Sequence, residues 1–272
     1  MTDQYAVFGN PIEHSKSPNI HRLFAVQTMQ SMHYGKQCIE LAGFAAAVKT
    51  FFGQGGKGLN ITVPFKEQAF AIADTLSERA EKAGAVNTLI MQDDGKVCGD
   101  NTDGVGLVRD MQNNHGWPIK DRNILLLGAG GAVRGVLGPL LAEQPTSLTI
   151  ANRTVAKAEH LAGLFSNDGA VQALDFSAIP EQAFDIIING TSASLSGSIP
   201  MISAKLIGSK TRCYDMMYSQ QLTPFLQWAK EQGCVQLADG LGMLVEQAAE
   251  AFYLWRGVRP QTATVIKQLR AN

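Results

Sequence analysis

The order of hydrophobic and polar positions predicts strands and helices that alternate along most of the chain. Residues 124–127 are four apolar residues in a row, which is typical of a strand buried on both faces of a parallel sheet. A glycine cluster follows directly, and apolar residues then return at helical spacing through residues 136–141. A strand, a glycine turn and a helix in this order direct backbone N–H groups and a positive helix end toward a phosphate.

The second half of the chain repeats this alternation. The hydrophobic pattern predicts strands at residues 147–151, 171–174, 184–188, 213–216 and 235–237, and helices at residues 155–165 and 224–231. Alternation of this kind indicates a doubly wound parallel sheet. The last segment, residues 240–271, is predicted to be helical with one buried face.

The first half predicts shorter elements. Strands are expected at residues 5–8, 59–63, 86–91 and 96–99, and helices at residues 17–30, 44–52, 77–82 and 105–111, with a further short helix that opens at Lys66. The glycine-rich residues 53–58 are interpreted as a flexible connector, because they follow a helix and precede a strand. The alternation in residues 59–63 is expected to place Leu59, Ile61 and Val63 on one face.

The helix at residues 17–30 carries its own start signal. Ser17 is the predicted N-cap, since Pro18 then occupies the first turn, where proline is tolerated. Its buried face is expected to hold Ile20, Leu23 and Phe24, together with Val26 or Met29.

Composition restricts the class of protein. The 272 residues are 45% hydrophobic and 17% charged, which favours a globular chain over a disordered one. A net charge of -1 gives no electrostatic reason to expect nucleic acid or an anionic membrane as a partner. The four cysteines are far apart, which favours free thiols in a reducing cytosol over a disulfide framework or a zinc site. Without a signal-like or membrane-length apolar run, a cytoplasmic protein is expected.

The glycine cluster is a candidate cofactor site. Gly128 and Gly130 match the start of a G-x-G-x-x-G fingerprint, but Val133 occupies its last position. The alternative is a tight turn without a ligand. About 20 residues further on, where an NAD site places an acidic residue, the chain has Asn152-Arg153-Thr154, with Lys157 one turn later. Cations and hydroxyls suit a 2′-phosphate, so the pattern favours NADP over NAD, with a solvated turn as the alternative.

A second set of candidates lies in the first half, where small hydrogen-bonding residues follow strand ends and turns: Ser15, Ser17, Asn60, Thr62, Asn87 and Thr102. Such a lining suits a polyhydroxylated substrate with a carboxylate. Lys66 and Asp103 add one charge of each sign and could form a proton-transfer pair for a ketone reduction. Each residue by itself is also an ordinary turn former, cap or solvated lysine. His14 and His21 lack metal-ligand spacing, and no metal is expected.

Taken in order, these motifs resemble those of shikimate dehydrogenases. The matching segments are VFGNPI (7–12), HSKSP (14–18), NITVPFK (60–66), GAVNT (84–88), GDNTDG (99–104), GAGGA (128–132), NRT (152–154) and DGLGML (239–244). The resemblance implies NADPH-dependent reduction of 3-dehydroshikimate to shikimate in chorismate and aromatic amino-acid biosynthesis. We therefore expect an α/β protein of two domains. A substrate domain of residues 1–103 would be completed by residues 240–272, and a Rossmann-like, doubly wound NADP domain would span residues 104–239.

The resemblance also implies residue roles. Lys66 and Asp103 would be the catalytic pair. Substrate would be bound by Ser15, Ser17, Thr62, Asn87, Asp103, Tyr218 and Gln247. NADP would be bound by Gly128, Ala129, Gly130, Gly131, Ala132, Asn152, Arg153, Thr154 and Lys157, with Met216 and Gly240 near the nicotinamide. The family often has arginine where this chain has Lys157, and Asn189-Gly190-Thr191-Ser192 departs from a more usual Asn-Ala-Thr-Ser.

Two alternatives remain at this point. One is a quinate/shikimate dehydrogenase that also uses NAD, against which the absence of an acidic residue at positions 152–154 argues. The other is a catalytically silent shikimate-binding regulator, which the presence of both Lys66 and Asp103 disfavours. A small molecule is the expected partner, with neither nucleic acid nor membrane, and a homodimer stays open.

Overall fold

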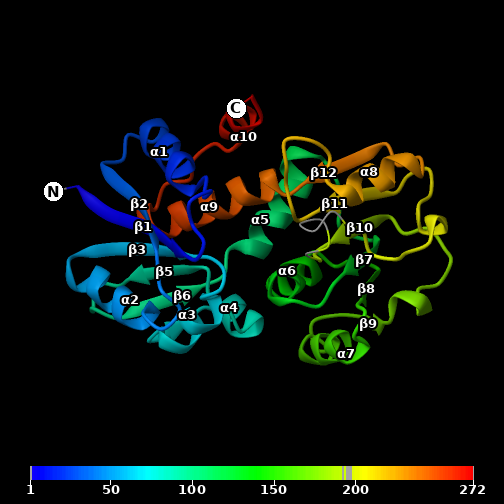
Figure 1. The fold of residues 1–272 in the computed structure, drawn as a ribbon, viewed down its shortest axis with the longest axis horizontal. Helices are drawn as coiled ribbons and strands as arrows, with labels where there is room; N and C mark the ends of the chain where they lie inside the picture. Colours follow the sequence, from blue (N-terminus) through cyan, green and yellow to red (C-terminus); the bar gives the residue numbers. More distant parts are fainter. Residues whose placement is uncertain (1, 192, 194–197, 272) are drawn as a thin grey trace. The chain divides into compact units, whose positions relative to one another are not determined.

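A computed structural model describes residues 2–191, 193 and 198–271, and it divides the chain into two compact units. Unit 1 comprises Met1–Gly106 and Val245–Asn272, and unit 2 comprises Leu107–Leu244. Both crossings between the units fall inside helices, α5 (Asp103–Arg109) and α9 (Leu241–Arg256) (Figure 1). The boundaries expected from the sequence, after residues 103 and 239, lie a few residues earlier in the chain.

Unit 1 is built on a six-stranded mixed sheet with the order β2-β1-β3-β5-β6-β4 (Figure 1). Its strands are β1 (Asp3–Gly9), β2 (Met32–Cys38), β3 (Gly56–Ile61), β4 (Thr75–Leu76), β5 (Thr88–Met91) and β6 (Val97–Asp100). Its further helices are α1 (Ser17–Gln27), α2 (Phe44–Gly53), α3 (Lys66–Ile72), α4 (Glu78–Ala83) and α10 (Ala263–Ala271). β1 is parallel to β2 and β3, whereas β5 is antiparallel to β3 and β6.

Unit 2 is built on a six-stranded sheet in which every pairing is parallel, with the order β12-β11-β10-β7-β8-β9. Its strands are β7 (Asn123–Leu127), β8 (Ser147–Ala151), β9 (Val171–Leu174), β10 (Ile186–Asn189), β11 (Arg212–Asp215) and β12 (Gln236–Asp239). A π-helical turn (Asp110–Asn114) extends α5, and the helices are α6 (Gly131–Ala142), α7 (Val155–Leu164) and α8 (Pro224–Glu231). The strand order reverses between β7 and β10, which is the Rossmann arrangement. The predicted doubly wound parallel sheet is confirmed.

Alternate residues of β7 enter opposite cores of unit 2. Ile124 and Leu126 pack in a core with residues of α5, α6 and α7, whereas Leu125 and Leu127 pack in another with residues of α8. A strand with a core on each face has no exposed side, which is why its sequence is continuously apolar.

The glycine-rich segment after α2 differs from the prediction, because its second half is part of β3 rather than a flexible connector. A Cβ at Gly56 would lie 2.2 Å from the Phe51 ring, and one at Gly58 would lie 2.3 Å from the Trp255 ring. These glycines therefore let two aromatic rings pack directly on the strand backbone.

The first helix also corrects the sequence interpretation. α1 begins at Ser17 with Lys16 as its N-cap, so the predicted cap is one residue late. Ile20 and Phe24 are fully buried, but Val26 and Met29 are 70% and 92% exposed, and neither belongs to the core. Val63 is likewise exposed, because β3 ends two residues earlier and the alternation does not continue.

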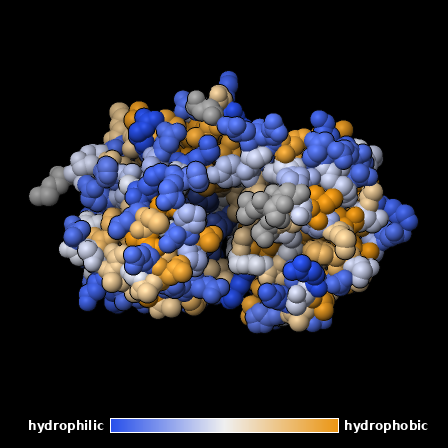
Figure 2. Space-filling model, in the orientation of Figure 1, coloured by the Kyte–Doolittle hydropathy of each residue, from blue (hydrophilic) through white to orange (hydrophobic). Residues whose placement is uncertain are grey.

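On the face of the molecule drawn in Figure 2, orange apolar residues are scattered among blue polar ones.

The chain after residue 240 is helical, as predicted, but forms two helices. Gly257 follows α9 with a φ of +69°, a left-handed conformation that ends a helix and that glycine adopts without strain. No helix in the described part of the chain is both long and apolar enough to cross a membrane.

Candidate active site

Lys66 and Asp103 form a close ion pair in unit 1. Lys66 is the first residue of α3, shortly after the turn at residues 63–64, and Asp103 is the first residue of α5. Lys66 Nζ lies 2.5 Å from Asp103 Oδ2, with the side chains 29% and 13% exposed. The pair is therefore partly shielded from water while one side of the lysine stays accessible.

The sheet explains why residues so far apart in sequence meet here. β3, β5 and β6 are neighbours in antiparallel order, so the end of β3, the start of β5 and the end of β6 lie at one edge. The backbone fixes this edge, since Val86 N–H donates to the Lys66 carbonyl at 2.9 Å and Asn87 N–H donates to the Asp100 carbonyl at 3.0 Å.

Asn87 joins the ion pair to two further polar residues. Its Nδ2 lies 2.8 Å from Asp103 Oδ1 and 2.9 Å from Thr102 Oγ1. Gln247 Oε1, on α9, lies 3.4 Å from Asn87 Nδ2 and 3.3 Å from Thr102 Oγ1. The structure thus brings Lys66, Asp103, Asn87, Thr102 and Gln247 into one polar cluster.

Three further predicted substrate residues lie where β1 and β3 end. Ser15 Oγ accepts the Ser17 backbone N–H at 3.3 Å in the loop that leads into α1. Thr62 follows β3 directly, and its N–H donates to the Phe8 carbonyl at 3.0 Å. Parallel neighbouring strands end at the same edge, which is where α/β proteins bind ligands. Direct contacts of these three residues with a substrate stay predictions.

The glycine turn of unit 2 has the geometry of an anion cradle. Gly128 has a φ of +105°, which only glycine adopts readily, and it lies against the backbone of Gly190 at the point where the strand order reverses. A Cβ at Gly130 or Gly131 would meet no described atom within 4 Å. Open space therefore lies at the N-terminus of α6, whose N-cap Gly130 provides no side-chain hydrogen bond.

A small cavity adjoins this turn. It has a volume of about 150 Å³ and is lined by Ala129, Gly130, Asn152, Arg153, Thr154 and Lys157. Asn152 is held by a 2.9 Å hydrogen bond from its Nδ2 to the Thr154 carbonyl, whereas the Arg153 and Lys157 side chains are exposed. Two cations and a hydroxyl beside the glycine turn fit a phosphate group, so the residues present fit NADP.

Met216 and Gly240 also lie together in unit 2. Gly240 N–H donates to the Met217 carbonyl at 3.0 Å, and Met216 N–H donates to the Asn189 carbonyl at 2.9 Å. A Cβ at Gly190 would lie 2.4 Å from Val133 and 3.1 Å from the Met216 sulfur, which explains the glycine in the loop after β10. Thr191 Oγ1 donates to Asn189 Oδ1 at 2.7 Å, and Ser192 lies outside the described residues.

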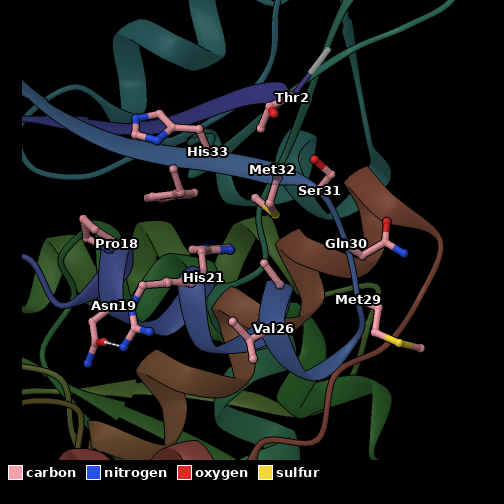
Figure 3. Close-up of a pocket in the computed structure, with 13 residues that line it drawn as sticks. Thr2, Pro18, Asn19, His21, Val26, Met29, Gln30, Ser31, Met32 and His33 are labelled. Carbon is pink, nitrogen blue, oxygen red and sulfur yellow. Dashed lines mark hydrogen bonds between the residues drawn. The ribbon is translucent and has the colours of Figure 1, made fainter.

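A larger cavity, of about 740 Å³, lies between α1 and β2 in unit 1 (Figure 3). Pro18, His21, Val26, Met32 and His33 are among its lining residues, and none of the predicted site residues is. Among the described residues, no group of three or more histidine, cysteine, aspartate or glutamate side chains could hold a metal ion.

Sequence comparison decides the family. Residues 7–89 match the shikimate dehydrogenase substrate binding domain, residues 110–203 match the shikimate / quinate 5-dehydrogenase domain, and residues 240–270 match the shikimate 5'-dehydrogenase C-terminal domain. A Cellvibrio japonicus protein named shikimate dehydrogenase (NADP(+)) is 57% identical over 270 residues, which cover 99% of this chain and 98% of that protein. The chain belongs to the NADP-dependent shikimate dehydrogenase family.

Solved structures support the same family. An Ael1 enzyme from Pseudomonas putida matches with a TM-score of 0.94 and 49% identity, over 98% of each chain. Shikimate 5-dehydrogenase from Thermus thermophilus, solved in complex with NADP(H) and shikimate, matches with a TM-score of 0.86 and 31% identity, over 99% of each chain. The two-domain α/β fold is thus shared with shikimate dehydrogenases.

Within this shikimate dehydrogenase fold, Tyr218 stands apart from the other predicted substrate residues. It belongs to unit 2, whereas Lys66 and Asp103 belong to unit 1. Burial raises the pKa of Tyr218, and the negative charge of Asp239 raises it further, so its hydroxyl stays protonated at neutral pH. A protonated hydroxyl can donate to a substrate oxygen, and its role in binding stays a prediction.

Two residues that hydrogen-bond to predicted site residues were missed from the sequence. Thr88 Oγ1 donates to Asn87 Oδ1 at 2.8 Å, and Tyr34 OH donates to Asn60 Oδ1 at 2.7 Å. Threonine and tyrosine are typical strand residues, so neither position carries a signal of its own. Tyr34 also lies on β2, a strand that was not predicted because residues 32–38 lack regular alternation.

His21 gives this shikimate dehydrogenase family member a pH-dependent stability. It is fully buried, and its ring stacks on Tyr34 with 4.1 Å between centroids. Burial lowers the pKa of His21 from 6.5 to about 3, and the Asn60 side chain acts in the opposite direction. Between pH 6.5 and 3 the unfolded chain takes up a proton here that the folded chain does not, so stability falls as the pH decreases through this window.

Urea unfolding at pH 7 and pH 5 tests this effect. From pH 7 to pH 5, the free energy of unfolding of the wild type is expected to fall by about 2 kcal/mol more than that of His21→Phe. Exposed His33 on β2 provides the matched control, and His33→Gln is expected to behave as the wild type does. Equal pH dependence in His21→Phe and the wild type would contradict a neutral buried imidazole.

Proposed function

We propose that this chain catalyses the reversible NADPH-dependent reduction of 3-dehydroshikimate to shikimate, a step of aromatic amino-acid biosynthesis. The observation that carries the proposal is the 2.5 Å pair of Lys66 and Asp103, set among hydrogen-bonding side chains at one sheet edge. The cation-lined cavity beside the Gly128 turn supports NADP as the cofactor. The name of the Cellvibrio japonicus relative, 57% identical over nearly the whole chain, agrees with both.

Lys66 has the central chemical role in this proposal. Bound NADPH would supply a hydride to the carbonyl carbon of the substrate, and the carbonyl oxygen would then need a proton. Lys66 Nζ donates that proton, and in the reverse direction it accepts the proton of the shikimate hydroxyl. Asp103 holds the ammonium group in place through its Oδ2, 2.5 Å away. Ser15, Ser17, Thr62, Asn87, Tyr218 and Gln247 bind the remaining hydroxyl and carboxylate groups of the substrate.

Different residues of unit 2 are assigned to different groups of NADP. The glycine turn, from Gly128 through Ala132, offers backbone N–H groups and the N-terminus of α6 to the pyrophosphate. The 2′-phosphate would be held by Asn152, Arg153, Thr154 and Lys157, which line the small cavity. The nicotinamide would be bordered by Met216 and Gly240, which lie together.

Quinate is the second candidate substrate. Residues 110–203 match a family described as shikimate / quinate 5-dehydrogenase, and this description is the reason to consider quinate. The chain has Asn152-Arg153-Thr154 in place of the acidic residue expected for NAD, so the accompanying use of NAD is disfavoured. A silent shikimate-binding regulator is disfavoured by the intact Lys66–Asp103 pair.

An oxidation assay on the purified protein separates these candidates. Shikimate with NADP⁺ is expected to give rapid formation of NADPH, whereas quinate under the same conditions gives at least tenfold slower turnover. Faster turnover with quinate would favour the second candidate. Binding of shikimate with no turnover would favour the regulator.

The location and assembly of the protein complete the proposal. We place it in the cytoplasm, because Cys38, Cys98, Cys213 and Cys234 are all free thiols, as expected in a reducing compartment. A homodimer is the assembly to be tested, and light scattering of the purified protein distinguishes it from a monomer.

A further inference from the structure

A buried chain of hydrogen bonds runs from Tyr34 on β2 to the Lys66–Asp103 pair. We propose that Tyr34, Asn60 and Thr88 are positioning residues, which fix the amide of Asn87 so that Asp103 holds Lys66 in its proton-transfer position. This inference rests on the proposed function, since it concerns the same reaction. It assigns a role in turnover to three buried residues, one of which, Asn60, was expected from the sequence to line the substrate site but bonds to protein groups instead.

Each step of the chain is a short contact between buried groups. Tyr34 OH donates to Asn60 Oδ1 at 2.7 Å, and Asn60 Nδ2 donates to Thr88 Oγ1 at 3.2 Å. Thr88 Oγ1 donates to Asn87 Oδ1 at 2.8 Å, and Asn87 Nδ2 donates to Asp103 Oδ1 at 2.8 Å. Thr88 is completely buried, and Tyr34, Asn60, Asn87 and Asp103 are each no more than 9% exposed when the whole residue is counted.

The donor of each step follows from the one before it. Tyr34 has a single hydroxyl proton, and burial raises its pKa well above the usual value, although the Ser17 side chain acts in the opposite direction. The hydroxyl therefore stays protonated and donates to Asn60 Oδ1, which turns Asn60 Nδ2 toward Thr88. Thr88 accepts from that amide, so its only proton is directed to Asn87 Oδ1.

The orientation of Asn87 is fixed from two sides. Its Oδ1 accepts the Thr88 hydroxyl and also the backbone N–H of Thr102 at 2.9 Å. An amide with its oxygen held in this way presents its Nδ2 to Asp103 Oδ1. Asp103 then accepts at both oxygens, from Asn87 at Oδ1 and from Lys66 at Oδ2. A carboxylate held at both oxygens in this way stays in one rotamer.

A purely structural role accounts for this arrangement less well. Valine has nearly the shape of threonine and would fill the space between β3 and β6 without a polar group to satisfy. A buried hydroxyl without its partners is unfavourable, so a series of buried polar groups of this length is a costly way to fill a core. Hydrogen bonds aligned in one direction strengthen one another, and this alignment ends at the catalytic carboxylate.

The test compares Thr88→Val, which keeps the shape and removes the hydroxyl, with Thr88→Ser, which keeps the hydroxyl. We expect Thr88→Val to lower kcat for shikimate oxidation by about 10- to 100-fold, because a misplaced catalytic group reduces the rate on this scale. KM for NADP⁺ is expected to stay within about twofold, and Thr88→Ser to retain kcat within about threefold of the wild type.

Two further variants keep the result decisive. Tyr34→Phe removes one oxygen at the far end of the chain and is expected to lower kcat by a few fold, even if Thr88→Val fails to fold. In a Lys66→Ala background, Thr88→Val is expected to add no further loss, since it acts through the lysine.

The outcomes separate this inference from the proposed function. A wild-type protein without turnover of shikimate would overturn the proposed function and with it the inference. An active wild type with unchanged kcat in Thr88→Val or, where that variant does not fold, in Tyr34→Phe, would overturn the inference alone. Equal losses in Thr88→Ser and Thr88→Val would overturn it as well, because they would trace to packing rather than to the hydroxyl.

Discussion

Replacing Lys66 with alanine is expected to lower kcat for shikimate oxidation by about 10²–10⁴-fold, the range of a lost general acid–base group. Lys66 is the only partner that the structure gives to Asp103 Oδ2 among the described residues, at 2.5 Å, and it is the proposed proton carrier. Its removal leaves bound NADP⁺ able to accept the hydride but leaves the hydroxyl proton of shikimate without an acceptor. Steady-state kinetics with saturating NADP⁺ measures the effect.

The loss is expected in kcat far more than in binding. A group that acts mainly in the transition state changes kcat and kcat/KM together. Asp103→Asn is expected to lower kcat in the same direction, because a neutral amide attracts the ammonium group less strongly. Lys96, exposed beside the turn between β5 and β6, is the matched control, and Lys96→Ala is expected to retain full activity. If Lys66→Ala bound shikimate and kept full turnover, the role proposed for this lysine would be wrong.

Replacing Arg153 with alanine is expected to raise KM for NADPH by about 10- to 100-fold and to leave KM for NADH nearly unchanged. Arg153 and Lys157 are exposed cations beside the cavity of about 150 Å³ at the glycine turn. A hydrogen bond to a charged group contributes about 1.5–3 kcal/mol, which corresponds to this change in affinity. NADH lacks the 2′-phosphate and therefore loses nothing when the cation is removed.

Substitutions of Lys157 are expected to change KM for NADPH by smaller amounts than Arg153→Ala does. Arginine binds phosphate with two parallel hydrogen bonds, whereas lysine acts as a point charge. Lys157→Ala is therefore expected to raise KM for NADPH less than Arg153→Ala does, and Lys157→Arg to lower it slightly. Exposed Lys120, elsewhere in unit 2, is the matched control. An equal rise of KM for NADPH and NADH in Arg153→Ala would show that the arginine does not distinguish the two cofactors.

The parallel sheet of unit 2 was predictable because burial on both faces makes the sequence of a strand continuously apolar. Residues 124–127 are apolar without interruption since each face of β7 has a core, and the turn residues that follow lie at the reversal of strand order. β2 gave no such signal, because it lies at the edge of its sheet and only Tyr34 in it is buried. Gly58 was read as part of a connector because the Trp255 ring packed against it lies almost 200 residues later in the chain.

Some residues of the candidate site were likewise predictable from the sequence, and others were not. Lys66, Asn87 and Asp103 were recognisable because charged and amide side chains follow predicted strand ends, and the structure places them within hydrogen-bond distance. Thr88 and Tyr34 were not, since each is linked to Asn60 by a hydrogen bond between strands that are distant in sequence. A local sequence pattern contains only residue types and their spacing. The hydrogen bonds from Tyr34 to Thr88 depend instead on how β2, β3 and β5 are placed in the sheet.

The central claim, that this chain is an NADP-dependent shikimate dehydrogenase, is tested most directly by one comparison. The kcat/KM for shikimate oxidation by the purified protein is measured with NADP⁺ and with NAD⁺, and 3-dehydroshikimate is identified as the product. The account predicts rapid formation of 3-dehydroshikimate and a kcat/KM at least tenfold higher with NADP⁺. No turnover of shikimate, or a preference for NAD⁺, would contradict it.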